Sequence, residues 1–101
     1  MIARLWHGYT DPTNAPIYEQ LLLTHILPGI HRIKGYKGCY LLQRKDGGEV
    51  EFITLTLWES LDAVKEFAGP DYSKAVIVPE AEALLTRHDA ESVHYECVRS
   101  D

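Results

Sequence analysis

Hydrophobic residues change their spacing along the chain, and the changes divide it into strands, helices and turns. Residues 2–8 (IARLWHG) predict a short strand, which the turn-forming stretch TDPTNAP follows. Residues 17–33 predict a helix with Asn14 as its cap, and Pro28 should kink or restart it because proline lacks a backbone N–H. The positions that recur at helical spacing, and so should share the buried side, are Ile17, Leu21, Thr24 or His25, and Pro28.

The second half of the chain repeats this alternation. Two strands flank Asp46-Gly47-Gly48, a strong hairpin signal, because glycine supplies the positive φ that the turn needs. Ser60 should cap a second helix that Gly69-Pro70 ends. A short helix over residues 79–86 and a last strand, SVHYECV, complete the pattern. The hydrophobic positions expected on one face of the second helix are Leu61, Val64, Phe67 and Ala68.

The predicted order is strand, helix, strand, strand, helix, strand. This βαββαβ order is that of an α+β ferredoxin-like fold, in which helices cover one face of a four-stranded antiparallel sheet. Residues 1–101 should form one domain, because the length is near the usual domain size.

The third strand bears on what covers the second face of the sheet. Ile53, Leu55 and Leu57 share one face, and Phe52, Thr54, Thr56 and Trp58 share the other. A face exposed to water would carry charged residues, and neither set does. We expect the face with Phe52 and Thr54 to be the bare one and to pack against the sheet of a second copy. The alternative is an apolar face that stays exposed.

Composition narrows the class of protein. The chain is 46% hydrophobic, 25% charged and has a net charge of −5, which argues against binding nucleic acid or an anionic membrane. It shows no signal-peptide pattern and no spanning apolar stretch, and it has two cysteines, so we expect a reduced, cytoplasmic protein. In the predicted strand order Cys39 and Cys97 lie at opposite edges and should be free thiols.

Three segments carry a resemblance that spans almost the whole chain. The opening MIARLWHG, the corner LTLWESLDAVKEFAG and the closing VHYECV resemble the antibiotic biosynthesis monooxygenase family. The resemblance implies a homodimer of ferredoxin-like subunits, the dimeric α/β barrel, with a pocket between each sheet and its own helices. Members include cofactor-independent oxygenases of phenolic polyketides, quinol oxygenases and haem-degrading enzymes.

Candidate site residues follow from the chemistry that such an oxygenase needs. An aromatic cleft, a base and a donor to a developing oxyanion would let a phenolate react with dioxygen without cofactor or metal. The residues chosen as catalytic are His7, His25 and Tyr72. The residues chosen for substrate binding are Arg4, Trp6, Trp58 and Phe67. Trp6 and His7 face opposite sides of one strand, so only one of them can face a given cleft.

Each of these residues also has a structural interpretation. Trp58 and Phe67 suit a hydrophobic core, His25 suits a buried hydrogen-bonded position, and Arg4 suits a surface or dimer ion pair. His94 and Tyr95 match a recurring family pattern that can be structural.

Cofactor and metal sites are not expected. His25 and His31 are six residues apart and do not share a helical face. The haem-degrading relatives carry a histidine iron ligand shortly after the second helix, whereas this chain has no histidine between His31 and His88. Two functions remain: a cofactor-independent monooxygenase acting on a small aromatic, phenolic or quinol substrate, and a non-catalytic small-molecule-binding or stress-associated dimer.

Overall fold

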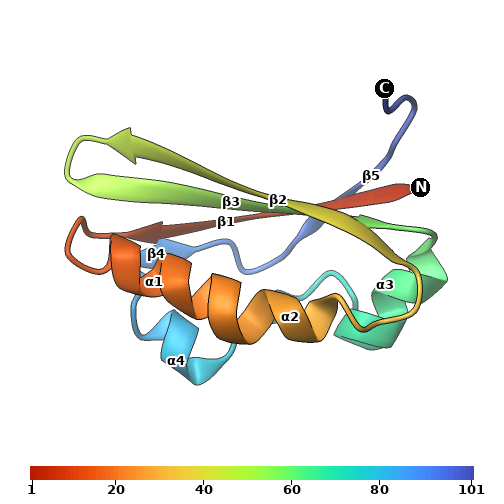
Figure 1. The fold of residues 1–101 in the computed structure, drawn as a ribbon, viewed down its shortest axis with the longest axis horizontal. Helices are drawn as coiled ribbons and strands as arrows, with labels where there is room; N and C mark the ends of the chain where they lie inside the picture. The colour runs from red at the N-terminus through yellow and green to blue at the C-terminus, as the bar shows by residue number, and fades with distance from the viewer.

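A computed structural model describes residues 1–101, and in it every helix lies on the same side of one antiparallel sheet (Figure 1). None of the helices combines the length and the hydrophobicity that a membrane-spanning helix requires. The elements in chain order are β1 (Ile2–Thr10), α1 (Ala15–Leu21), η1 (Leu22–Ile26), α2 (Leu27–Ile30), β2 (Tyr36–Asp46), β3 (Glu49–Trp58), α3 (Leu61–Ala68), α4 (Pro79–Glu82), β4 (Arg87–His88) and β5 (Val93–Glu96).

The sheet has the order β2-β3-β1, and β4 and β5 both pair with the free edge of β1. The predicted ferredoxin-like order is therefore confirmed, but the expected last strand is two short strands. Between them Asp89 replaces regular pairing, because its carboxylate Oδ2 accepts the backbone N–H of His7 at 2.9 Å. The backbone N–H of Asp89 in turn donates to the carbonyl of His7, at 2.9 Å.

The prediction of which sheet face is bare was wrong. Phe52 and Trp58 are fully buried beneath the helices, on the same face as Thr54 and Thr56. Strand alternation separates the two faces but does not say which one the helices cover, and both faces of β3 are apolar. The face without helices instead carries an apolar set from four strands: Leu5, Tyr40, Leu42, Ile53, Leu55, Leu57, Val93 and Tyr95.

A π-helical turn shifts the buried side of the first helical run. The expected positions Ile17 and Leu21 each precede a buried residue by one, and Ile17 is 53% exposed. The spacing lengthens to five residues across η1, where a π turn adds a residue just before Pro28 opens α2. The buried positions of the run are Tyr18, Leu22, Leu27 and Ile30.

Turn and cap signals were mostly correct. Ser60 Oγ accepts the N–H of Ala63 at 3.2 Å, and Gly69 ends α3 with φ +85°. Asn14 precedes α1 without capping it, because its side-chain amide donates to the carbonyl of Leu84 at 3.4 Å. The Gly47-Gly48 turn joins β2 and β3 as expected.

Cys39 and Cys97 are both free, as predicted. Cys39 lies in the edge strand β2, and Cys97 follows β5 at the opposite edge. Burial raises the pKa of the Cys39 thiol, which favours its uncharged form.

The core consists of two separate clusters. In the first, the rings of Tyr18 and Phe52 meet edge to face at 4.9 Å. In the second, Trp58 stacks on Phe67 at 5.4 Å and donates its indole N–H to Thr56 Oγ1 at 2.9 Å. The expectation that Trp58 packs in the core, at the corner between sheet and helix, is confirmed.

Candidate functional site

A cavity of about 360 Å³ lies between the covered face of the sheet and the helices. Its volume is within the usual range for small-molecule sites. Twelve of its 18 lining residues are hydrophobic, so its walls suit an aromatic ligand. The lining residues are Arg4, Trp6, Tyr18, Leu22, His25, Ile26, Leu27, Gly29, Ile30, Ile33, Thr54, Thr56, Phe67, Val76, Ile77, Val78, Ala81 and Ser92.

The cavity separates the two core clusters, and the sequence of β3 accounts for its position. The covered face of β3 carries the large rings of Phe52 and Trp58 with Thr54 and Thr56 between them. The short threonine side chains leave space where a larger residue would join the clusters. The π-helical turn η1 lies over this space and contributes His25 and Ile26 to the wall, and such turns are frequent at functional sites.

Arg4 is the buried cation of this site. It is 5% exposed, and no carboxylate lies within ion-pair distance of it. Its Nη1 donates to the carbonyl of Tyr72 at 2.6 Å, its Nη2 donates to the carbonyl of Lys74 at 3.1 Å, and its guanidinium lies 5.5 Å from the centre of the Phe67 ring. Burial lowers the pKa of Arg4 to about 10, so the group stays charged at neutral pH.

His94 is the third partner of Arg4. Its Nε2 lies 2.9 Å from Arg4 Nη1. Burial, and then the nearby charge of Arg4, lower the pKa of His94 below its usual 6.5. The neutral imidazole therefore accepts a hydrogen bond from Arg4 and leaves the positive charge uncompensated.

Trp6 forms a fixed aromatic wall. Its indole Nε1–H donates to the carbonyl of Asp89 at 2.8 Å, and its ring lies 5.6 Å from that of His88. Because Asp89 holds its indole N–H and His88 of β4 lies beside its ring, Trp6 presents a fixed surface to the cavity.

Tyr18 and His25 add two polar groups to the helical wall. Burial raises the pKa of Tyr18 to about 12, so its hydroxyl stays protonated and able to donate. His25 lines the cavity from η1 and is exposed to solvent, and its side chain forms no hydrogen bond within the chain. Among the five histidines it is the one that lines the cavity.

The cavity brings together four of the seven predicted site residues: Arg4, Trp6, Phe67 and His25. His7 lies on the bare face of the sheet, where its Nδ1 is 2.7 Å from Asp89 Oδ2. Tyr72 follows α3 outside the lining, with its ring 5.1 Å from that of His94. Trp58 lies behind Phe67, in the core.

Sequence reasoning missed Tyr18, Thr54 and Thr56 as lining residues. The two threonines between Phe52 and Trp58 were a usable signal, because short side chains in a row of large ones leave room. Tyr18 was not recognisable while the face of the first helical run was misassigned.

The chain contains no group of three or more His, Cys, Asp or Glu side chains that could hold a metal ion.

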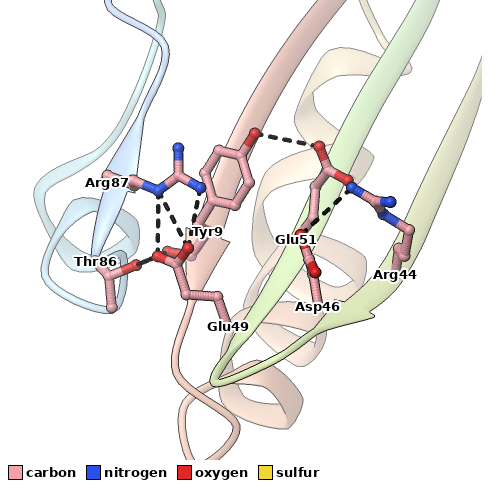
Figure 2. A network of polar contacts seen from close by, with 7 residues as sticks. All are labelled: Tyr9, Arg44, Asp46, Glu49, Glu51, Thr86 and Arg87. Atoms are coloured by element: carbon pink, nitrogen blue, oxygen red, sulfur yellow. Dashed lines mark hydrogen bonds and ion pairs between the residues drawn. The ribbon is translucent and has the colours of Figure 1, made fainter.

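A polar network lies at the end of the sheet that carries the β2–β3 turn (Figure 2). Glu49 pairs with Arg87 at 3.0 Å, and the guanidinium of Arg87 lies 3.7 Å from the centre of the Tyr9 ring. The hydroxyl of Tyr9 donates to Glu51 at 3.2 Å, and Arg44 pairs with Glu51 at 3.1 Å. Tyr9, Glu51 and Arg44 share the bare face, so they form a polar border to its apolar part.

No family model and no curated protein sequence matches the chain. Solved structures match it over nearly its whole length. A protein from Deinococcus radiodurans described as a candidate antibiotic biosynthesis monooxygenase has 16% identity and a TM-score of 0.70, covering 100% of this chain and 96% of its own. SnoaB from Streptomyces nogalater, a cofactor-independent oxygenase, has 16% identity and a TM-score of 0.67 in a variant form, covering 98% and 95%.

A haem degrader has the same fold. MhuD from Mycobacterium tuberculosis, solved with two haems in its active site, has 19% identity and a TM-score of 0.64, covering 100% of this chain and 99% of its own. The fold that the sequence resemblance implied is therefore confirmed, and proteins of this fold differ in their chemistry.

Proposed function

We propose that this chain, which has the fold of the antibiotic biosynthesis monooxygenases, is a cofactor-independent monooxygenase acting on a small phenolic or quinol substrate. The observation that carries the proposal is the cavity of about 360 Å³, whose walls combine aromatic rings with one buried cation and one unpaired histidine. SnoaB, a cofactor-independent oxygenase, shares this fold over almost its full length.

The cavity supplies what the substrate needs before it meets dioxygen. A flat ring packs among Trp6, Tyr18 and Phe67, which exclude water. His25 lines the same space and removes the phenolic proton, since imidazole is the side chain suited to proton transfer near neutral pH. The positive charge of Arg4 favours the anionic form of the substrate, because electrostatic interactions are strong away from water.

The electron-rich anion then reduces dioxygen directly. One oxygen atom forms a bond to a ring carbon, the other leaves as water, and the substrate supplies all the electrons. A dihydroxynaphthalene would thus react with one molecule of dioxygen to give a hydroxynaphthoquinone and one molecule of water. Tyr18 lines the same cavity, and its protonated hydroxyl donates to the developing oxyanion.

The proposal includes a homodimer. The bare face of the sheet is apolar at its centre, and the half-exposed side chains there include Leu42 and Val93, at 47% and 48%. A second copy of this face would cover it, with Tyr9, Arg44 and Glu51 at the border, which matches the usual anatomy of protein interfaces. If the chain stayed monomeric, this face would leave a contiguous apolar patch exposed to water, which is rare in monomers.

The direct test measures oxygen consumption with a panel of naphthols, quinols and anthrones. Wild-type protein should consume oxygen faster than the protein-free control with at least one compound. Thr54→Phe places a ring in the cavity from a rigid strand and should reduce the rate at least tenfold. Thr13→Phe, at an exposed position outside the cavity, is the matched control and should keep the wild-type rate. Binding without oxygen uptake would favour the non-catalytic small-molecule-binding dimer.

A further inference from the structure

We infer that the Arg4 guanidinium binds a carboxylate on the aromatic ligand, so that the substrate class is an aromatic acid rather than a neutral phenol. This inference deepens the proposed function, although the binding of an acid does not itself depend on turnover. Arg4 has no counterion within the chain. A buried charged side chain normally has a partner of opposite charge, because an uncompensated charge away from water is costly. Arg4 is 5% exposed and has only two carbonyls and a neutral imidazole as partners.

The donors of Arg4 are only partly used. Guanidinium has five N–H groups, and the contacts within the chain engage Nη1 twice and Nη2 once. The Nε–H and one Nη2–H remain without an acceptor. These two donors belong to neighbouring nitrogens of one plane, and a carboxylate can accept both at once. A single phenolic oxygen cannot match this geometry as well.

The surroundings of Arg4 fix its position and leave the cavity as the place for an acceptor. The carbonyls of Tyr72 and Lys74 and the ring of His94 hold the guanidinium in place, and the Phe67 ring centre lies 5.5 Å from it. Arg4 also lines the cavity, whose walls are otherwise mostly apolar. A ligand with an apolar ring and one carboxylate therefore complements the site in both shape and charge.

Two probes of almost equal shape test this inference without any turnover. Isothermal titration calorimetry at about pH 7.5 would compare 2-naphthoate with its neutral counterpart 2-naphthamide, and 2-naphthol would test the phenolic alternative. Wild-type protein should bind 2-naphthoate at least roughly tenfold more tightly than either neutral compound, a difference of about 1.4 kcal/mol. Equal affinities, or no binding of any of the three, would overturn the inference.

Two variants locate the effect at Arg4. Arg4→Met removes the charge with little change in length and should bind 2-naphthoate and 2-naphthamide within about twofold of each other, since one charge-assisted contact accounts for the discrimination. Arg4→Lys keeps the charge and should keep part of the preference. A full preference for 2-naphthoate in Arg4→Met would show that the acid binds elsewhere.

A spectroscopic measurement covers the case in which Arg4→Met does not fold. In the NMR spectrum of wild-type protein, the chemical shift of the Arg4 Nε–H should change when 2-naphthoate is added and stay unchanged with 2-naphthamide. An unchanged signal with both compounds would count against the inference. If neutral quinols are oxidised while acids bind no better than amides, the carboxylate site fails and the proposed monooxygenase stands.

Discussion

Replacing Leu55 with glutamate should prevent the proposed homodimer from forming. Leu55 lies at the centre of the bare face, between Leu5 of β1 and Tyr40 of β2, so a carboxylate there would be enclosed in the dimer without a partner. In a separate subunit the same carboxylate would face water. The substitution therefore acts on the dimer and leaves the fold of each subunit largely unaffected.

The expected effect on the free energy of dimerisation follows from the exposure of this face. Tyr40, Leu42, Val93 and Tyr95 are 47% to 59% exposed, so covering them gains roughly 1 kcal/mol each, half of what full burial gives. Both subunits contribute, which gives about 8 kcal/mol before Leu5 and the half-buried β3 residues are added. Association itself costs roughly 4–15 kcal/mol. One unpaired carboxylate per subunit, at about 3–5 kcal/mol each, costs about 6–10 kcal/mol in the dimer, which is comparable with the apolar gain itself.

Light scattering after size exclusion would measure the mass of wild-type and Leu55→Glu protein across a range of concentrations. We expect a dimer for the wild type and a folded monomer for the variant, with similar circular dichroism. Val98→Glu, at a position that is 94% exposed, is the matched control and should remain dimeric. A wild-type monomer, or a Leu55→Glu dimer of unchanged affinity, would refute the assignment of this face.

Three further predictions concern single side chains. His25→Ala should lower the oxygenation rate by roughly 10²- to 10⁴-fold, which is the usual contribution of a general base. His31→Ala lies on the same helical run but outside the cavity and should keep the wild-type rate. Equal rates for the two variants would remove His25 from the mechanism. The folded-state pKa of His94 lies below 6.5, so its contribution to stability is present above pH 6.5 and is lost as the pH falls through the lowered pKa. In urea unfolding, His94→Gln should therefore lose less stability at acidic pH than the wild type. An unchanged pH dependence of the free energy of unfolding would contradict this. Trp58→Ala should reduce the free energy of unfolding by about 3–5 kcal/mol in a thermal or urea melt, whereas a loss below about 1 kcal/mol would argue against its place in the core.

The sequence predicts the topology well because its signals are local. The Asp46-Gly47-Gly48 turn, the Ser60 cap and the Gly69 stop each fix a boundary through the conformation of a few residues. The alternation of β3 correctly separates two sets of side chains. Which set meets the helices depends on the path of the chain across the sheet, and the apolar character of both sets removes the usual clue.

The site was harder to predict because it depends on two features without a local signal. The π-helical turn at η1 changes which side of the first helical run is buried, and with it the place of Tyr18. The burial of Arg4 requires the carbonyls of Tyr72 and Lys74, which are about 70 residues away in sequence. One signal was available: Arg4 stands in an otherwise apolar alternating row with Ile2 and Trp6, as a core-facing arginine would.

The central claim is that the chain inserts oxygen into an aromatic substrate with no bound cofactor, and isotope labelling tests it most directly. Metal-free, cofactor-free protein would be incubated under ¹⁸O₂ with the compound that gives the fastest oxygen uptake, and the product analysed by mass spectrometry. The account predicts one ¹⁸O atom in the product, formed well above the level in the Thr54→Phe variant. A product without ¹⁸O, or one formed equally by Thr54→Phe and by the protein-free control, would contradict it.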